Sequence, residues 1–178
     1  MTGRDAKVQP LDAAGLRALA LRYVGKYATS EAKLRRYLGR KLFERGWAGE
    51  ISPPTDEIVG QMAERGYVDD RLFAEARARG LGSKGFGARR VSADLGAAGI
   101  GRDLAAEVSS TTTDPMTAAI AFAKRRRFGP FGREPGAADP DRSRKQFAAM
   151  MRAGHAVDVT RKVLGAADSE AFDGLDDD

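Results

Sequence analysis

Apolar side chains recur along most of this chain at the spacing of one helix face. The first such stretch follows the i, i+3, i+4 pattern that builds an apolar stripe on a helix, with Leu16, Leu19, Ala20, Tyr23, Val24 and Tyr27. Runs of alternating Val, Ile, Thr and aromatic residues, which mark a half-buried strand, are missing. The pattern therefore predicts an all-α protein.

Cap and stop signals divide this pattern into helices. We expect them over residues 11–28, 31–45, 55–65, 70–79, 88–98, 102–108, 115–127, 140–152 and 156–164. Side chains that can cap a helix stand at several of the expected starts, at Thr29 or Ser30, Thr55, Asp69 or Asp70, Asp114 and Asp139. The last two are followed by proline, a favoured first residue of a helix.

The stretch from Gly66 to Ile100 lies at the centre of the pattern. Leu72, Phe73 and Ala76 are expected to form the buried side of its first helix. The glycines at 80, 82, 85 and 87 are expected to break that helix before the next one begins.

One short sequence motif in this stretch recurs elsewhere in the chain. It is centred on Gly46, Gly99 and Gly154, which are about 53 to 55 residues apart. The residues four positions earlier are Leu42, Leu95 and Met150, and the residues directly after are Trp47, Ile100 and His155. Three helices bury little surface alone, so adjacent units should pack in a row. The sequence thus predicts an elongated array of three tandem three-helix repeats.

The repeat sets the expected domain boundaries. They are a disordered N-terminus over 1–10, repeats over 11–66, 67–110 and 111–165, and an acidic disordered tail over 166–178. Residues 128–138 are rich in Gly and Pro and are expected to form a loop. The tail either occupies a basic groove as a DNA mimic or only aids solubility.

The charge is unevenly distributed. The net charge is +5, but six of the 25 acidic residues lie from Asp168 onward, so residues 1–167 carry 30 basic and 19 acidic side chains, or +11. A positive body suggests contact with a polyanion or an acidic protein surface. The alternative is a charge that serves solubility alone.

Several site types are excluded or disfavoured by composition. With one His and no Cys, the chain has no Cys-His pair and no multi-His metal site. A metal site built from carboxylates alone stays open, but the acidic residues stand mostly at helix caps and in the tail. We expect no catalytic site, no cofactor and no metal. No apolar signal region and no run of about 18 apolar residues is present. This favours a cytoplasmic protein without membrane contact.

For three local features we favour a structural interpretation over a functional one. Residues 80, 82 and 85 satisfy GxGxxG, but a dinucleotide site requires a preceding strand, and here a helix precedes them. Asp69 and Asp70 fit helix capping better than a catalytic or metal-binding pair. His155 follows a helix-ending glycine, so packing is favoured over a pH-sensing or ligand role.

Basic side chains form three clusters, one in each repeat. They are Lys33, Arg36 and Arg40; Arg71, Arg77, Arg79, Lys84, Arg89 and Arg90; and Lys124, Arg125, Arg126 and Arg127. A single cluster is usually a solvated face, whereas periodic clusters suit several contacts along a filament. Tyr37, Phe43 and Trp47 are candidates for base stacking, although core packing is favoured for them.

Four segments resemble the RecX family of bacterial regulatory proteins. They are SEAKLRRYLGRKLFERGW, GYVDDRLFAEA, KGFGARRVSADLGAAGI and RSRKQFAAMMRAGHAVDVTRKVL, which occur in this order over most of residues 15–165. The chain departs from the family pattern at His155, where an aromatic residue is usual, and in the insertion at 128–138.

The resemblance implies a monomeric protein that binds RecA and the RecA filament on single- and double-stranded DNA. It further implies that the protein modulates, most often inhibits, strand exchange and ATP hydrolysis in DNA repair and recombination, without being an enzyme. The alternative is a general DNA-binding protein that affects RecA only indirectly, through competition for DNA.

Overall fold

A computed structural model describes residues 9–132 and 139–172 of the chain. Its described residues are mostly helical, and their one β-type pairing is an isolated bridge between Leu11 and Trp47. The chain divides into an N-terminal unit, residues 1–73, and a C-terminal unit, residues 74–178. Among the described residues, no helix combines the length and apolar character needed to cross a bilayer. The expected all-α fold is confirmed.

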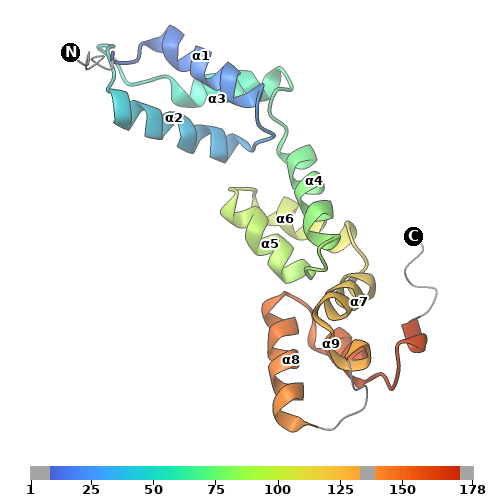
Figure 1. The fold of residues 1–178 in the computed structure, drawn as a ribbon. Coiled ribbons are helices and arrows are strands. Elements are labelled where there is room, and N and C mark those ends of the chain that lie inside the picture. Colours follow the sequence, from blue (N-terminus) through green and yellow to red (C-terminus); the bar gives the residue numbers. More distant parts are fainter. Residues whose placement is uncertain (1–8, 133–138, 173–178) are drawn as a thin grey trace, which may run out of the picture. The chain divides into compact units, whose positions relative to one another are not determined.

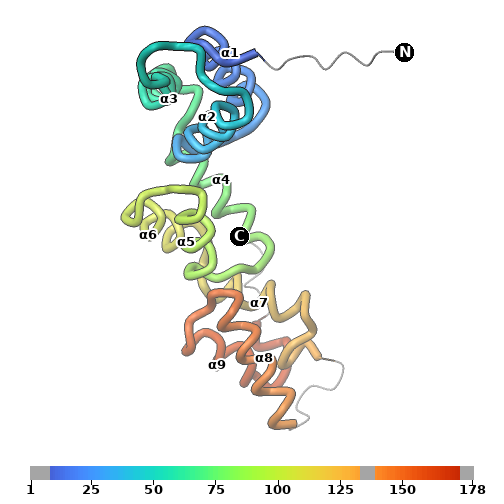
Figure 2. Tube along the Cα trace, turned by 90° about the vertical axis from the view of Figure 1, so that its left-hand side faces the viewer, coloured from blue at the N-terminus to red at the C-terminus, as the bar shows by residue number. Residues whose placement is uncertain are grey.

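The N-terminal unit is a three-helix bundle. It contains α1 (Ala13–Val24), α2 (Glu31–Arg45) and α3 (Thr55–Glu64), and every pair of these helices is in contact. Seen nearly end-on, the three helices form a triangle (Figure 2). Their facing sides share a core of fully buried residues, which includes Leu16, Leu34, Leu38, Ile58 and Met62.

Helix α2 has the predicted bounds. Ser30 is extended and accepts a hydrogen bond from the backbone N–H of Lys33, and Gly46 ends the helix with φ +80°. Helix α3 differs at its start, because Pro54 takes the N-cap position and Thr55 is already helical, without a side-chain cap. The proline ring fixes φ near a helix-compatible value, so the expected cap at Thr55 was wrong.

Helix α1 is shorter than the predicted 11–28. Leu11 is extended, with its N–H and C=O bonded to Gly46 and Ala48, and Asp12 becomes the cap that accepts from Gly15. At the other end the helix stops at Val24. Gly25 is the C-cap, and its N–H donates to the carbonyl of Leu21.

The paired aspartates cap two different helices. Asp69 accepts from the N–H of Leu72 at 2.9 Å, in the first turn of α4 (Asp70–Gly82). Asp70 accepts from the N–H of Glu31 at 2.9 Å, the first residue of α2. Donors at helix N-termini have no intrahelical acceptor, so both carboxylates satisfy groups that would otherwise lack one. The capping interpretation is confirmed.

Helix α4 begins in the N-terminal unit and continues into the C-terminal unit (Figure 1). It runs through Gly80 to Gly82, beyond the predicted end. Its buried residues are Ala74, Ala78, Leu81 and Gly82, whereas Leu72 is 63% exposed and Ala76 is exposed. The predicted buried side was therefore wrong at both positions, because the buried face of α4 is the one that carries Ala74, Ala78 and Leu81.

Helices α5 (Ala88–Ala97) and α6 (Arg102–Thr111) follow as a closely packed pair. Val91 and Leu95 are buried as predicted. Helix α6 extends three residues past its predicted end at Val108. In this last part of the helix the hydroxyls of Ser109 and Thr111 each donate to the carbonyl four residues earlier, at 2.6 and 2.9 Å.

The last helices are α7 (Pro115–Arg126), α8 (Pro140–Arg152) and α9 (Val157–Gly165), with a 3-10 turn, η1 (Gly129–Phe131), between α7 and α8. Asp114 and Asp139 cap α7 and α8 as predicted. Residues 128–132 of the expected loop contain η1, and the rest of it, 133–138, lies outside the described residues.

The start of the expected acidic tail differs from the sequence-based expectation. Residues Glu170–Phe172 form a second 3-10 turn, η2, and Phe172 is 7% exposed. Its ring centroid lies 6.0 Å from that of Phe131, within the core built on Ile120, Phe122 and Met150. The start of the acidic segment therefore packs on the C-terminal core through the ring of Phe172.

The repeated glycines share a positive φ. Gly46, Gly99 and Gly154 have φ of +80°, +86° and +93°, a left-handed range that favours glycine at helix ends. After the last two, Ile100 and His155 donate to the carbonyls of Leu95 and Met150. This is the hydrogen bond of a Schellman motif. The repeated sequence motif therefore ends a helix at a glycine each time that it occurs.

Within the C-terminal unit, glycines join the turn before α5 to the turn before α9. Gly87 donates to the carbonyl of Ala153 at 2.9 Å, and Arg89 donates to that of Gly154 at 3.3 Å. A Cβ at Gly87 would lie 2.4 Å from the Gly154 carbonyl oxygen, and a Cβ at Gly85 would lie 2.6 Å from the Phe122 nitrogen. We call Gly85, Gly87 and Gly154 the glycine junction, because backbone meets backbone there.

His155 lies beside this junction and is 2% exposed. Its Nε2 is 3.1 Å from the Gly85 carbonyl oxygen, and its ring centroid is 5.6 Å from that of Phe122. Burial lowers the pKa of His155, and the hydrogen bond to Gly85 opposes this in part. The packing interpretation is confirmed.

Candidate functional site

The first basic cluster lies along α2. Arg36 and Arg40 are exposed, and Lys33 is half-buried with its Nζ 4.9 Å from the Phe73 ring centroid. Arg40 Nε is 3.6 Å from a Glu44 carboxylate oxygen. A hydrogen bond from Lys41 lowers the pKa of that carboxyl, and Arg40 adds to the effect. The predicted stripe therefore includes two exposed guanidinium groups.

Arg40 also lines a pocket that the sequence did not reveal. We call it the tyrosine pocket; its volume is about 380 Å³ and its lining residues are Arg22, Tyr23, Lys26, Tyr27, Tyr37 and Arg40. Only Tyr37 and Arg40 were candidates from sequence. A possible signal was the repeated i, i+4 spacing of Arg22 with Lys26 and of Tyr23 with Tyr27. Tyr23 and Tyr27 were predicted to belong to the apolar stripe of the first helix, and Arg22 and Lys26 were not among the candidates.

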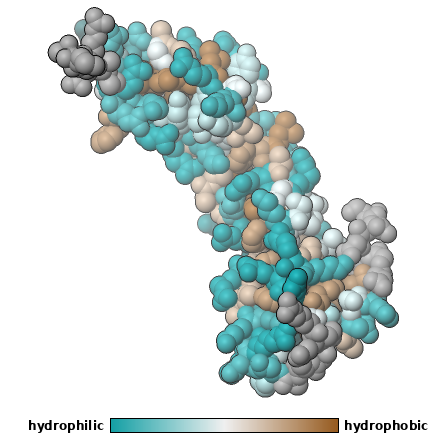
Figure 3. Space-filling view, viewed as in Figure 1, coloured by the Kyte–Doolittle hydropathy of each residue, from teal (hydrophilic) through white to brown (hydrophobic). Residues whose placement is uncertain are grey.

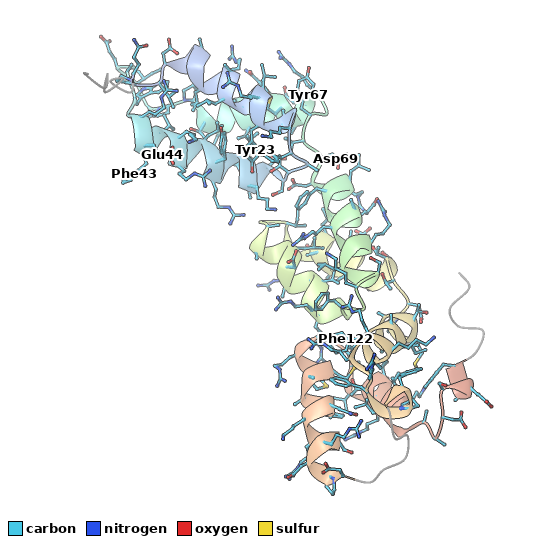
Figure 4. The ribbon with its side chains drawn as sticks, viewed as in Figure 1. Tyr23, Phe43, Glu44, Tyr67, Asp69 and Phe122 are labelled. Atoms are coloured by element: carbon cyan, nitrogen blue, oxygen red, sulfur yellow. The ribbon has the colours of Figure 1, made fainter. Side chains whose placement is uncertain are left out.

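The other aromatic candidates separate into two kinds. Tyr37 and Trp47 are partly buried against the core of the N-terminal unit, and Trp47 Nε1 donates to the Ile51 carbonyl at 2.6 Å. Phe43 is 93% exposed. In Figure 4 it projects from the end of α2 away from the bundle. Core packing therefore accounts for Trp47 but not for Phe43.

The second cluster does not form one group. Arg71 belongs to the N-terminal unit and the other five residues to the C-terminal unit. Arg77 forms a two-point ion pair with Asp94 on α5, at 2.7 and 3.0 Å. This hydrogen bonding raises the pKa of Arg77 against a smaller effect of burial. The contact joins α4 to α5 and occupies the guanidinium.

Arg89 and Arg90 stand in the first turn of α5, where both are exposed. The first turn of a helix favours negative charge, so two cations there are disfavoured by the helix dipole. Helix stability therefore does not explain them. Lys84 and Arg79 are also exposed, and the Lys84 carbonyl accepts a hydrogen bond from Arg125.

The third cluster ends α7, where the helix dipole favours cations. Lys124 Nζ is 5.7 Å from the Phe131 ring centroid, and Arg126 Cζ is 5.7 Å from that of Phe122. Arg127 has φ +56°, the only positive value for a non-glycine residue among those described. Its left-handed conformation ends the helix where glycine would be usual.

Arg126 and Arg127 line a second pocket, of about 440 Å³, with residues from the start of α8. Its other lining residues are Phe128, Asp139, Asp141, Arg142, Lys145 and Gln146. Sequence reasoning missed Arg142 and Lys145. Hydrophilic residues cover the visible face of α8 (Figure 3). Two carboxylates, Asp139 and Asp141, reduce the net positive charge of this pocket. Asp139 also caps α8, and Asp141 pairs with Arg144.

The described residues contain no group of three or more His, Cys, Asp or Glu side chains placed to hold a metal ion.

The glycines that match GxGxxG have structural roles. Gly80 and Gly82 lie inside α4, and Gly85 has φ +74° beside Phe122. No strand precedes these glycines among the described residues, so the geometry of a dinucleotide-binding loop is not present.

Comparison with known proteins places these features in a family. Residues 69–108 match the family model described as RecX, second three-helix domain. A regulatory protein RecX from Myxococcus xanthus (strain DK1622) is 28% identical over 169 residues, which cover 90% of this chain and 88% of that protein. A regulatory protein RecX from Agrobacterium fabrum (strain C58 / ATCC 33970) is 32% identical over 154 residues, covering 83% of this chain and 80% of the relative.

Two solved structures have the same fold. The crystal structure of RecX from Lactobacillus salivarius matches with a TM-score of 0.64 at 15% identity, over 86% of this chain and 94% of that one. A second crystal structure of a regulatory protein RecX matches with a TM-score of 0.63 at 18% identity, over 86% and 74% of the two chains. With the sequence relatives, the family model and the repeated helix stops in agreement, the chain belongs to the RecX family of regulatory proteins.

Proposed function

We propose that this protein binds RecA and the RecA filament on DNA, as a monomer, and inhibits strand exchange and ATP hydrolysis. The observation that carries the proposal is the presence of exposed cations in each of the three predicted repeats of a RecX-family chain. Arg36 and Arg40, Arg89 and Arg90, and the end of α7 supply them. Several weak contacts along one filament combine into strong binding, because each bound contact raises the effective concentration of the next.

Arg89 and Arg90 are the strongest of these candidates. They are exposed, and the helix dipole disfavours cations where they stand, so helix stability does not explain their position. Guanidinium groups bind phosphates and carboxylates at two points. Both DNA and an acidic RecA surface therefore fit their chemistry.

The test is RecA-catalysed ATP hydrolysis and strand exchange, measured with and without the protein at substoichiometric amounts. We expect inhibition of both. The double variant Arg89→Ala, Arg90→Ala should weaken inhibition while its helical content stays unchanged. Arg161→Ala with Lys162→Ala is the matched control, because it removes two exposed cations from α9, outside the three clusters. No effect of the native protein on either reaction would contradict the proposal.

Binding in the absence of DNA separates the direct from the indirect mechanism. A direct RecA partner should bind RecA free of DNA. A protein that only competes for DNA should bind DNA with an affinity that falls steeply with salt, and should not bind free RecA. The second result would replace RecA binding by competition.

A further inference from the structure

The tyrosine pocket of the N-terminal unit combines two kinds of side chain. Three tyrosines and three cations line it, and no carboxylate is among its lining residues. Its volume of about 380 Å³ falls in the range of small-ligand sites, about 300–1,000 Å³. The pocket thus offers aromatic faces and positive charge together.

The three rings form one aromatic cluster, which we call the platform. Tyr23 and Tyr37, from α1 and α2, stack with centroids 4.1 Å apart and planes 20° apart. Tyr27 lies in the turn after α1, tilted against Tyr23 with centroids 5.2 Å apart. Tyr23 and Tyr37 also pack on the core, so their position has a structural reason. Tyr27 is 49% exposed and continues the platform into solvent.

The cations surround these rings. Lys26 Nζ is 5.3 Å from the Tyr27 ring centroid, and Arg40 Cζ is 5.7 Å from that of Tyr37. Arg22 lies in the last turn of α1. Of the three, Arg40 has a carboxylate near it, Glu44 at 3.6 Å. An anionic ligand at the platform would therefore meet net positive charge.

This chemistry selects among ligand classes. A quaternary ammonium group would find aromatic faces but would be repelled by three cations. An acidic peptide would use the cations but gain little from the rings. A nucleotide with an unpaired base uses both, because the base stacks on tyrosine and its phosphates contact the cations. A base inside a duplex cannot do so, since its two faces already stack on neighbouring bases.

We propose that the tyrosine pocket stacks an unpaired base of single-stranded DNA on Tyr27, while Arg22, Lys26 and Arg40 contact the adjacent phosphates. The pocket would make binding to single strands stronger than binding to duplex. The inference rests on the proposed function, of which it names one DNA contact and its strand specificity.

The experiment measures binding of a fluorescently labelled oligothymidylate and of a labelled duplex by anisotropy, with the full chain. Tyr27→Ala should weaken binding to the single strand by about 5- to 100-fold, the range for loss of one stacked base. Duplex binding should change by no more than about twofold. Tyr27→Phe should retain single-strand affinity, because it keeps the ring.

Tyr67→Ala is the matched control. Tyr67 is 54% exposed in the same unit but does not line the pocket, so its loss should leave both affinities unchanged. Arg22→Ala should instead weaken binding to both strands and reduce the salt dependence, because phosphates are common to them. Arg65→Ala, an exposed arginine outside the pocket, controls for the lost charge.

An oligothymidylate with abasic sites tests the stacking itself. The native protein should bind it more weakly than the intact strand, and Tyr27→Ala should bind the two alike, because the base and the ring form one interaction. Equal loss of single-strand and duplex binding in Tyr27→Ala would overturn the inference. So would unchanged single-strand binding accompanied by weaker binding to DNA-free RecA, since the pocket would then take a protein.

The two proposals fail in different ways. A native protein that binds the single strand and inhibits RecA, with Tyr27→Ala behaving as native, overturns the pocket alone. A native protein that prefers single strands through Tyr27 but leaves RecA activity unchanged supports the pocket and overturns the proposed function. If the native protein binds no single strand at all, the pocket inference is overturned.

Discussion

The two units are stabilised by different kinds of contact. The N-terminal unit is held by large aliphatic side chains, such as Leu34 and Leu38, that fill the space between three helices. The C-terminal unit depends on the glycine junction, where backbone approaches backbone with no room for a Cβ. Of the seven large hydrophobic side chains exposed among the described residues, six lie in the N-terminal unit. Both units contain an apolar core and should lose stability when core volume is removed. The C-terminal unit is in addition sensitive to added volume at the glycine junction, and the N-terminal unit displays more apolar groups.

Gly154→Ala should have the largest effect on this comparison. The new Cβ would lie 2.4 Å from the Arg90 nitrogen, at a φ of +93°. The clash and the left-handed strain together should reduce the free energy of unfolding by about 4 kcal/mol. Gly96→Ala is the matched control, because nothing lies within 4 Å of its Cβ position in α5. It should be neutral or stabilise by up to about 1 kcal/mol.

Thermal unfolding followed by two signals can locate the damage. Trp47 is the single tryptophan of the chain and lies in the N-terminal unit, so its fluorescence reports that unit, whereas circular dichroism reports all helices. In Gly154→Ala the dichroism transition should move to lower temperature and the Trp47 transition should stay. If the dichroism and Trp47 transitions move equally, the two units unfold together, which would contradict their separate stabilisation.

Leu38→Ala should give the reverse result. Leu38 is 0% exposed in the N-terminal core, and removing a buried leucine side chain leaves a cavity that costs about 3 kcal/mol. The Trp47 transition should therefore move to lower temperature, while dichroism retains a later component from the C-terminal unit. An unchanged Trp47 transition would contradict the assignment of the core.

Arg77→Ala should have a smaller effect, on the contact of α4 with α5. Its side chain is 48% exposed and that of Asp94 is 24% exposed, so solvent weakens the pair, and we expect a loss of about 1 kcal/mol in urea unfolding. Arg79→Ala removes an exposed arginine from the same helix and should change stability by less than about 0.5 kcal/mol. Equal effects of the two variants would show that the two-point pair contributes nothing.

His155 should make the C-terminal unit weakly pH-dependent. Its pKa is lowered in the folded protein, so the unfolded chain binds more protons between the folded pKa and the ordinary histidine pKa of 6.5. Stability should fall as pH decreases through this window and stay level above it. The chain has one His, so His155→Phe should remove the dependence near pH 6.5. A dependence that persists in this variant would assign it to other groups.

Local signals in the sequence predicted much of the fold. Ser30 and Gly46 bound α2 because caps and left-handed glycines act within one turn, and Asp114 with Pro115 starts α7 in the same way. Periodicity predicted the burial of Ile58 and Met62. These features depend on neighbours in the sequence, which is why they could be predicted.

The rest depends on contacts between distant segments. The approach of Gly85 to Phe122 is set by tertiary packing, so the same glycines resembled simple helix breaks. Leu72 has an apolar side chain but is 63% exposed. The tyrosine pocket needs Tyr27 from the turn after α1 and Arg40 from α2. A pattern along one helix cannot show which side chains of another helix meet it.

Phe43→Ala should have the smallest effect on stability. It also allows an exposed phenylalanine of the N-terminal unit to be compared with a buried one of the C-terminal unit. Phe43 is 93% exposed, whereas Phe122 in the C-terminal unit is 4% exposed. Phe122→Ala should cost about 4 kcal/mol in urea unfolding. Phe43→Ala should change the free energy of unfolding by less than about 0.5 kcal/mol, because little burial is lost and alanine favours the helix. A loss above about 1 kcal/mol would mean that the exposed aromatic side chain supports the fold. A neutral result would leave a large apolar group in water with no folding benefit, which is the property expected of a binding surface.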